Sequence, residues 1–161
     1  MTTMTGRAVV VAVVWTAVAV LHAVPVRADN WPNWRGPALD GVAAGRGYVS
    51  SWSPTEHVLW RVKLPGLGAS TPAVWGDSVV VTCAIDGNDA AVCLDRSGRE
   101  LWRRALGAEK PGKHKKATGS NPSPVTDGRL VWVYFKSGEL AALNLADGAV
   151  VWRTNLQTRF G

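Results

Sequence analysis

The chain has 161 residues, with 18 basic and 12 acidic side chains, a formal net charge of +6, nine tryptophans and two cysteines. Four of the basic residues are lysines within residues 110–116 (KPGKHKK), and without these and the two arginines before residue 29 the charges balance. Nucleic-acid binders carry broad basic patches interleaved with aromatic residues, so a single lysine-rich loop argues against nucleic acid as a partner.

Residues 1–28 are predicted to be a signal peptide. Arg7 precedes an uncharged apolar run at residues 8–21, and Val26-Arg27-Ala28 has the small-x-small form that a signal peptidase accepts. The run is shorter than the about 20 residues that a membrane-spanning helix needs. We therefore expect cleavage after Ala28 and an exported protein, periplasmic or secreted, with no membrane span. An uncleaved anchor helix is the alternative.

Two segments precede the first complete structural unit. Residues 29–57 are predicted to form a loop-like amino-terminal segment, because prolines and glycines interrupt it throughout. Residues 58–64 (VLWRVKL) alternate apolar and basic side chains, which is the period of a β-strand with one buried face. No partner strands precede this segment, so we expect it to be an orphan outer strand.

One phrase occurs three times along the chain: LWRVKL at residues 59–64, LWRRAL at residues 101–106 and VWRTNL at residues 151–156. The last two copies each close a unit of four short predicted strands. We place these units, blade repeat 1 and blade repeat 2, at residues 69–106 and 121–156, with a basic linker at residues 107–120 between them. A period of about 50 residues is typical of propeller blades and solenoid units.

The repeat also aligns prolines, glycines and tryptophans at equivalent positions. A proline opens the first strand of each unit, one glycine follows that strand and another precedes the tryptophan strand. We therefore interpret nine residues as structural repeat positions: Trp60, Trp102, Trp152, Pro72, Pro124, Gly76, Gly128, Gly98 and Gly148.

A four-stranded unit of this size cannot bury both faces of its own sheet, so neighbouring units must stack. Large indole rings at one repeated position are then expected to act as wedges between adjacent sheets, with each ring N–H needing an acceptor. A cofactor-stacking role for the rings is the alternative hypothesis.

Two stretches, Pro72-Ala73-Val74-Trp75-Gly76-Asp77 and the run CLDRSGRELW at residues 93–102, resemble the repeat of pyrroloquinoline quinone (PQQ) type β-propellers. The opening NWPNWRGP at residues 30–37 is similar to that of secreted PQQ-like repeat proteins. The resemblance implies an all-β fold, here an incomplete β-propeller of about two four-stranded antiparallel blades plus one orphan outer strand. A closed ring needs four to eight blades. We therefore expect an amino-terminal fragment of a longer chain, whose remaining blades would be its first partners.

The two cysteines, Cys83 and Cys93, flank a turn-like stretch and are equidistant from Asn88. A hairpin centred on Asn88 would set them opposite each other, close enough for a disulfide in an oxidising compartment. Two small buried core residues with free thiols are the alternative.

Catalytic residues are not predicted. Quinoprotein dehydrogenases that resemble this repeat hold the quinone over a metal ion, and many have a disulfide between adjacent cysteines against the cofactor. Cys83 and Cys93 are ten residues apart, so that feature is missing here. The stretch at residues 86–89 (DGND) has oxygen ligands for calcium but the wrong spacing, and it favours a turn.

Two functional hypotheses follow. The first is an exported structural or interaction scaffold, with an envelope protein as a partner and no cofactor in this chain. The second is the amino-terminal part of a PQQ-dependent oxidoreductase whose active site lies mostly outside these residues. PQQ and calcium belong only to the second hypothesis.

Overall fold

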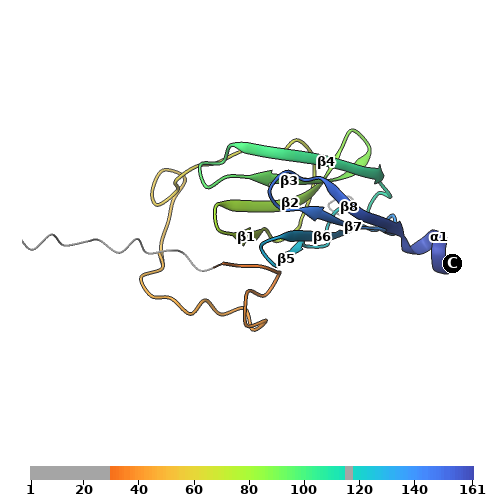
Figure 1. The fold of residues 1–161 in the computed structure, drawn as a ribbon. Coiled ribbons are helices and arrows are strands. Elements are labelled where there is room, and N and C mark those ends of the chain that lie inside the picture. Colours follow the sequence, from red (N-terminus) through yellow and green to blue (C-terminus); the bar gives the residue numbers. More distant parts are fainter. Residues whose placement is uncertain (1–29, 115–117) are drawn as a thin grey trace, which may run out of the picture.

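The computed structural model describes residues 30–114 and 118–161, so the predicted signal peptide lies outside the described residues. Two four-stranded antiparallel sheets lie side by side (Figure 1), which confirms the predicted all-β, partial-propeller fold. In each sheet the strands follow chain order. The first contains β1 (Ala73–Trp75), β2 (Ser78–Ile85), β3 (Asn88–Leu94) and β4 (Glu100–Ala108). The second contains β5 (Val125–Thr126), β6 (Leu130–Tyr134), β7 (Glu139–Asn144) and β8 (Val150–Asn155).

The turn predicted for residues 86–89 is present but shorter, because Asn88 and Asp89 already belong to β3. Asp86 and Gly87 connect β2 to β3 with φ angles of +49° and +73°. Two-residue hairpin loops with positive φ at both positions match the twist of the flanking strands, and Asp-Gly is a preferred sequence for them.

A bulge recurs at the same place in both sheets. Trp102 pairs with Cys93, but the next pair is Leu94 with Glu100, so one extra residue stands in β4. The second sheet repeats this shift where Trp152 pairs with Ala142. Because a bulge re-aims the side chains beside it, the two tryptophans leave their sheets in equivalent local settings.

The core lies between the two sheets. Apolar side chains of the facing sides form one buried cluster, with Trp75 packed against it. The opposite face of the first sheet buries a smaller cluster, and Leu64 packs there. The cluster between the sheets comprises Val80, Ala91, Cys93, Trp102, Leu106, Val131, Val133, Phe135, Ala141, Leu143 and Leu145.

Two segments differ from the sequence-based expectations. Residues 58–64 form no β-strand, because no neighbouring strand supplies ladder hydrogen bonds to them. The residues after β8 form a short helix that was not predicted, α1 (Leu156–Phe160). Its N-cap is Asn155, whose side-chain oxygen accepts a hydrogen bond from Thr158 N.

Candidate functional site

Trp102 joins the outer parts of the two sheets. Its Nε1 donates a hydrogen bond of 2.9 Å to Leu145 O in the second sheet. The ring lies against Gly148, where an added side-chain carbon would be 2.5 Å from the ring carbon Cε3. Gly148 has a φ of +68°, so both its backbone conformation and its lack of a side chain are required. The ring is 8% exposed and fills the space between the sheets.

Trp60 makes the same contact with the first sheet. Its Nε1 donates to Arg96 O at 2.6 Å, and an added carbon at Gly98 would lie 2.8 Å from the ring. Trp60 is 36% exposed, against 8% for Trp102. The segment at residues 58–64 therefore docks on a sheet although it forms no strand.

A second aromatic contact joins the sheets near β1. A carbon added at Gly128 would lie 2.3 Å from the ring of Trp75, so this glycine admits the ring as Gly148 admits Trp102. The repeat prolines lie next to this region: Pro72 directly precedes β1, and the fully buried Pro124 directly precedes β5. Gly76 has open space around its Cα and a φ of +55°, so the turn conformation alone requires glycine there.

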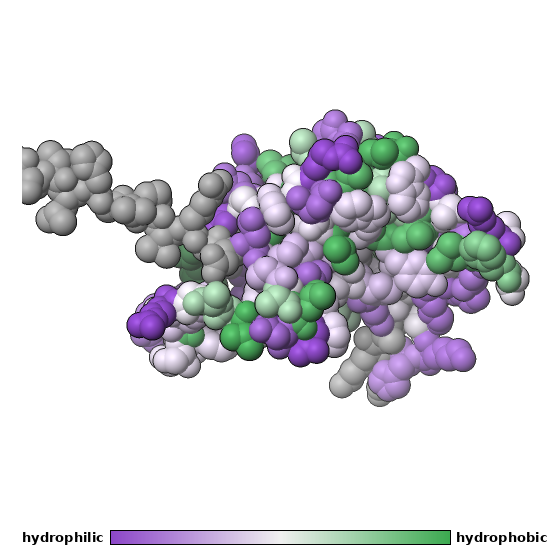
Figure 2. Space-filling view, turned by 60° about the horizontal axis from the view of Figure 1, so that its bottom comes forward, coloured by the Kyte–Doolittle hydropathy of each residue, from purple (hydrophilic) through white to green (hydrophobic). Residues whose placement is uncertain are grey.

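Trp152 is the third copy of the repeated tryptophan, and no third sheet among the described residues packs over it. Trp152 is 42% exposed, and Val150 and Val151 beside it are 40% and 50% exposed. We call these three residues the β8 surface. On the face of the molecule drawn in Figure 2, hydrophobic residues lie in small groups between polar ones.

The amino-terminal segment Asn30–Pro32 crosses one edge of both sheets, beside β1 and β5 (Figure 1). Trp31 exchanges two backbone hydrogen bonds of 2.8 Å with Val74, as an added strand residue would. Pro32 O accepts a hydrogen bond of 2.9 Å from Thr126 N in the second sheet. This short segment therefore satisfies backbone groups at the open edges of two separate sheets.

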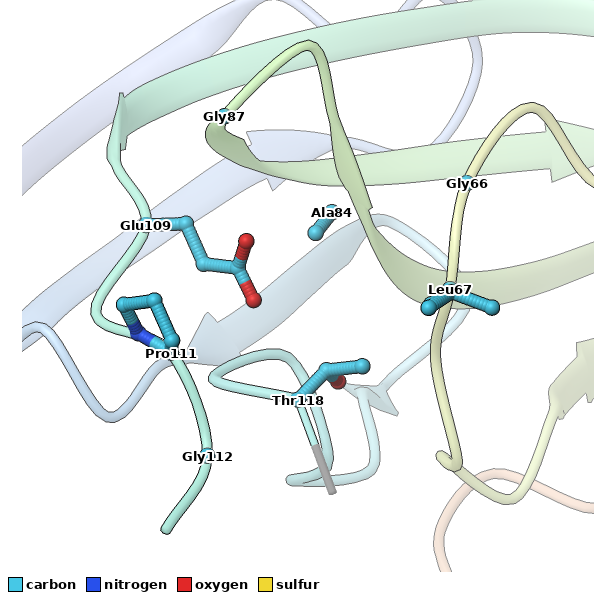
Figure 3. Close-up of a pocket in the computed structure, with 8 residues that line it drawn as sticks. All are labelled: Gly66, Leu67, Ala84, Gly87, Glu109, Pro111, Gly112 and Thr118. Atoms are coloured by element: carbon cyan, nitrogen blue, oxygen red, sulfur yellow. The ribbon is translucent and has the colours of Figure 1, made fainter. Parts of the chain in front are cut away.

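A hollow of about 420 Å³ lies beside the basic linker (Figure 3). Its only charged lining residue is Glu109, whose Oε1 accepts a hydrogen bond from Gly119 N. The lining residue with a hydroxyl group, Thr118, donates a hydrogen bond of 2.9 Å from its Oγ1 to Asn121 Oδ1. The lining residues are Gly66, Leu67, Ala84, Gly87, Glu109, Pro111, Gly112 and Thr118.

The hairpin expected around Asn88 is wrong in its register. Cys83 pairs with Ala90 and Cys93 pairs with Val80, because the turn is centred between Asp86 and Gly87. Both cysteines are buried with free thiols, and no disulfide joins them. Burial raises the pKa of each thiol, which disfavours the reactive thiolate.

The turn before β4 contains a carboxylate, Asp95, whose pKa is strongly lowered. Asp95 Oδ1 accepts hydrogen bonds from Ser97 N, Ser97 Oγ and Arg99 N, at 2.8, 2.6 and 3.0 Å. The Ser97 hydroxyl contributes most to lowering the pKa of Asp95 to about 2. The equivalent residue in the second sheet is Asn144, which cannot ionise.

Metal-binding side chains do not cluster among the described residues. Within residues 30–114 and 118–161, no three His, Cys, Asp or Glu side chains lie together in a way that could hold a metal. The residues of β1 and β5, AVW and VT, carry no charge that could balance a bound ion.

No helix of the described residues is long and apolar enough to span a membrane.

Comparison with known proteins gives a family and a fold. A family model for PQQ-type repeats, described as outer membrane protein assembly factor BamB, matches residues 41–161. Quinohemoprotein alcohol dehydrogenase from Comamonas testosteroni is 18% identical over 83% of this chain and 20% of its own, with a TM-score of 0.57. BamB from Moraxella catarrhalis is 23% identical over 55% of this chain and 23% of its own, with a TM-score of 0.36. This chain thus spans less than a quarter of either structure. No curated protein matches it.

Proposed function

Because the chain belongs to the family of PQQ-like β-propeller repeat proteins, we propose that it supplies two blades to an exported propeller that acts as a structural and interaction scaffold. Its best-developed side-chain contacts are those between tryptophans and glycines of successive units. They join one sheet to the next. The sites of acid–base or nucleophilic chemistry need paired titratable groups in reach of each other, and the described residues offer no such pair in a cleft.

The observation that carries the proposal is the β8 surface. Trp102 and Trp152 follow the same bulge, and the first is covered by a glycine turn of the next sheet. A further blade of the same kind would cover Trp152 in the same way. Such a blade is the partner that we propose for the β8 surface.

An envelope protein is the proposed second partner, and the periplasm or the exterior is the proposed location. The name of the matching family model, outer membrane protein assembly factor, supports an envelope role. The sequence of residues 1–28 supports export. Amino-terminal sequencing of the protein recovered from the envelope tests this part, with Asp29 expected as the first residue. Retention of Met1 in the exported protein would contradict it.

The scaffold is tested at the β8 surface by sedimentation of the purified chain over a range of concentrations. We expect Trp152→Glu to reduce association, because a buried carboxylate without a partner is costly. Trp52→Glu is the matched control, since Trp52 is 71% exposed in the amino-terminal segment. Equal association of both variants and the parent, or a parent that stays monomeric throughout, would argue against the proposal.

The quinoprotein hypothesis is the alternative, supported by the fold shared with a quinohemoprotein alcohol dehydrogenase. Titration with PQQ and calcium, followed by a dye-reduction assay, separates the two functions. Saturable quinone binding or turnover would favour the oxidoreductase over the scaffold.

A further inference from the structure

A buried aspartate lies at the joint between the two sheets, on strand β3. Asp89 is 0% exposed, and Ser120 Oγ donates a hydrogen bond of 2.9 Å to its Oδ1. Ser120 belongs to the segment that leads into the second sheet. The other carboxylate oxygen, Oδ2, is buried and accepts no hydrogen bond from the described residues. A buried charged oxygen without a donor is costly.

A second buried carboxylate, Glu139 on β7, lies on the second sheet at the same joint. Asp89 pairs across the strands with Gly107, so their side-chain positions share one face of the first sheet. A carbon added at Gly107 would lie 3.6 Å from Glu139 Oε2. Glu139 Oε2 therefore lies at van der Waals distance from a side-chain position on the face of the first sheet that carries Asp89.

Glu139 is itself only partly satisfied. It is 5% exposed, and its Oε1 accepts no hydrogen bond. Arg153 Nε lies 2.8 Å from this oxygen as an ion pair, but its N–H is not directed at the oxygen. Among the described residues, the cation that pairs with a carboxylate here, Arg153, thus compensates Glu139 rather than Asp89.

The other groups around Asp89 do not supply a positive charge. Ser137, from the turn before β7, interacts with the carboxyl group without a well-formed hydrogen bond to Oδ2. Glu109 adds a repulsive charge. The described lysines nearby are engaged elsewhere, Lys110 with Gln157 and Lys136 with Pro111 O. Burial therefore raises the pKa of Asp89, against the smaller lowering effects of Ser137 and Ser120.

We propose that Asp89 makes the contact between the two sheets dependent on a proton. When its carboxyl group is neutral, Oδ2 carries a hydrogen that it can donate toward Ser137, so the buried oxygen is no longer unpaired. When it ionises, the joint buries a second negative charge in addition to Glu139, and the described residues pair a cation with Glu139 but not with Asp89, so the joint weakens. The inference does not depend on the scaffold function.

The direction of the pH effect follows from the raised pKa. Below the ordinary value of 3.8, Asp89 is protonated in both the folded and the unfolded chain, so it contributes no pH dependence. Between 3.8 and the higher pKa of the folded state, the folded chain alone retains the proton. Stability contributed by Asp89 is therefore lost as the pH rises through this window.

The test compares the melting temperature of the parent and of Asp89→Asn between about pH 4 and pH 8. Asparagine imitates the neutral acid, because its NH₂ group can donate where Oδ2–H would. We expect equal melting temperatures at about pH 4 and a higher one for Asp89→Asn near neutrality. Asp77→Asn is the control, since the Asp77 side chain is 92% exposed and lies away from the joint. A difference that does not grow with pH, or that grows equally for Asp77→Asn, overturns the proposal.

A direct measurement covers the case in which Asp89→Asn fails to fold. The carboxyl carbon of Asp89 is followed by NMR in the folded parent as the pH is varied. A titration midpoint above 3.8, accompanied by shifts at Ser120 and Glu139, supports the proposal. A midpoint at or below 3.8 overturns it.

Discussion

Trp102 and Trp152 stand at the same position of two sheets with the same strand order and the same bulge. The first is 8% exposed and the second 42%. Their own sheets are therefore not what buries them. Burial comes from the glycine turn of the following sheet, which Trp102 has in Gly148. In such a repeat fold, each unit provides a ring and the next unit provides its site.

The largest expected difference in stability is between removing the indole ring of Trp102 and removing that of Trp152. Trp102→Ala should lower the free energy of unfolding by about 3–5 kcal/mol, because it leaves a cavity between the sheets and removes the donor to Leu145 O. Trp152→Ala should cost under about 1 kcal/mol in the same chain, since its ring is already partly in water. Urea unfolding followed by circular dichroism measures both. Similar losses for the two variants would show that the ring is stabilised within its own sheet.

The glycine side of the contact gives a smaller effect. Gly148→Ala should cost about 2–4 kcal/mol, because it combines a positive φ with an added carbon 2.5 Å from Trp102. Gly76→Ala, at a φ of +55° with nothing within 4 Å, should cost only about 1–2 kcal/mol. The same urea experiment applies. If the two substitutions cost the same, backbone conformation alone explains the glycine at position 148.

The smallest expected effect concerns the pH dependence of stability that comes from Asp95, in the turn before β4. Asp95 has a pKa lowered to about 2 by its hydrogen bonds, mainly that from Ser97. Its stabilising effect is present above the ordinary value of 3.8 and is lost as the pH falls toward 2. Asp95→Asn should lose less stability over this acid range than the parent, because an asparagine side chain does not take up a proton there and Asn144 stands at the equivalent position of the second sheet. Thermal melts from about pH 5 to pH 2 measure it. An unchanged acid dependence in the variant would contradict the assignment.

Much of the sheet architecture could be predicted, because the alternation, the prolines before the first strands and the turn glycines are all local signals. The strand register that places the two cysteines could not be predicted in this way. A two-residue turn at Asp86-Gly87 rather than a longer turn at Asn88 displaces every pair along β2 and β3. Residues 58–64 were predicted to be a strand but form none. Their alternating pattern fits a strand, but a strand also needs a hydrogen-bonded neighbour, which the pattern does not specify.

The sequence predicted most of the residues that take part in the contacts between units, but not how they pair. The repeated tryptophans and glycines are apparent from their spacing, but which ring meets which glycine depends on how the sheets stack. Trp75 with Gly128 was missed for that reason, although both flank recognisable turns. Asp89 was predicted only to be part of a turn, and nothing in its neighbours along the chain indicates that it is buried and bonded to Ser120.

The hydrogen bond from Thr126 N to Pro32 O closes a loop of 94 residues. Contacts that span such a long stretch of chain are slow to form, since the intervening entropy must be lost first. During synthesis, the ribosome must release the start of the second sheet before residues 30–32 can complete their contacts. Residues 30–32 are therefore made before both sheets but are among the last to form their native contacts, and until then the open edge of β1 is exposed to other chains.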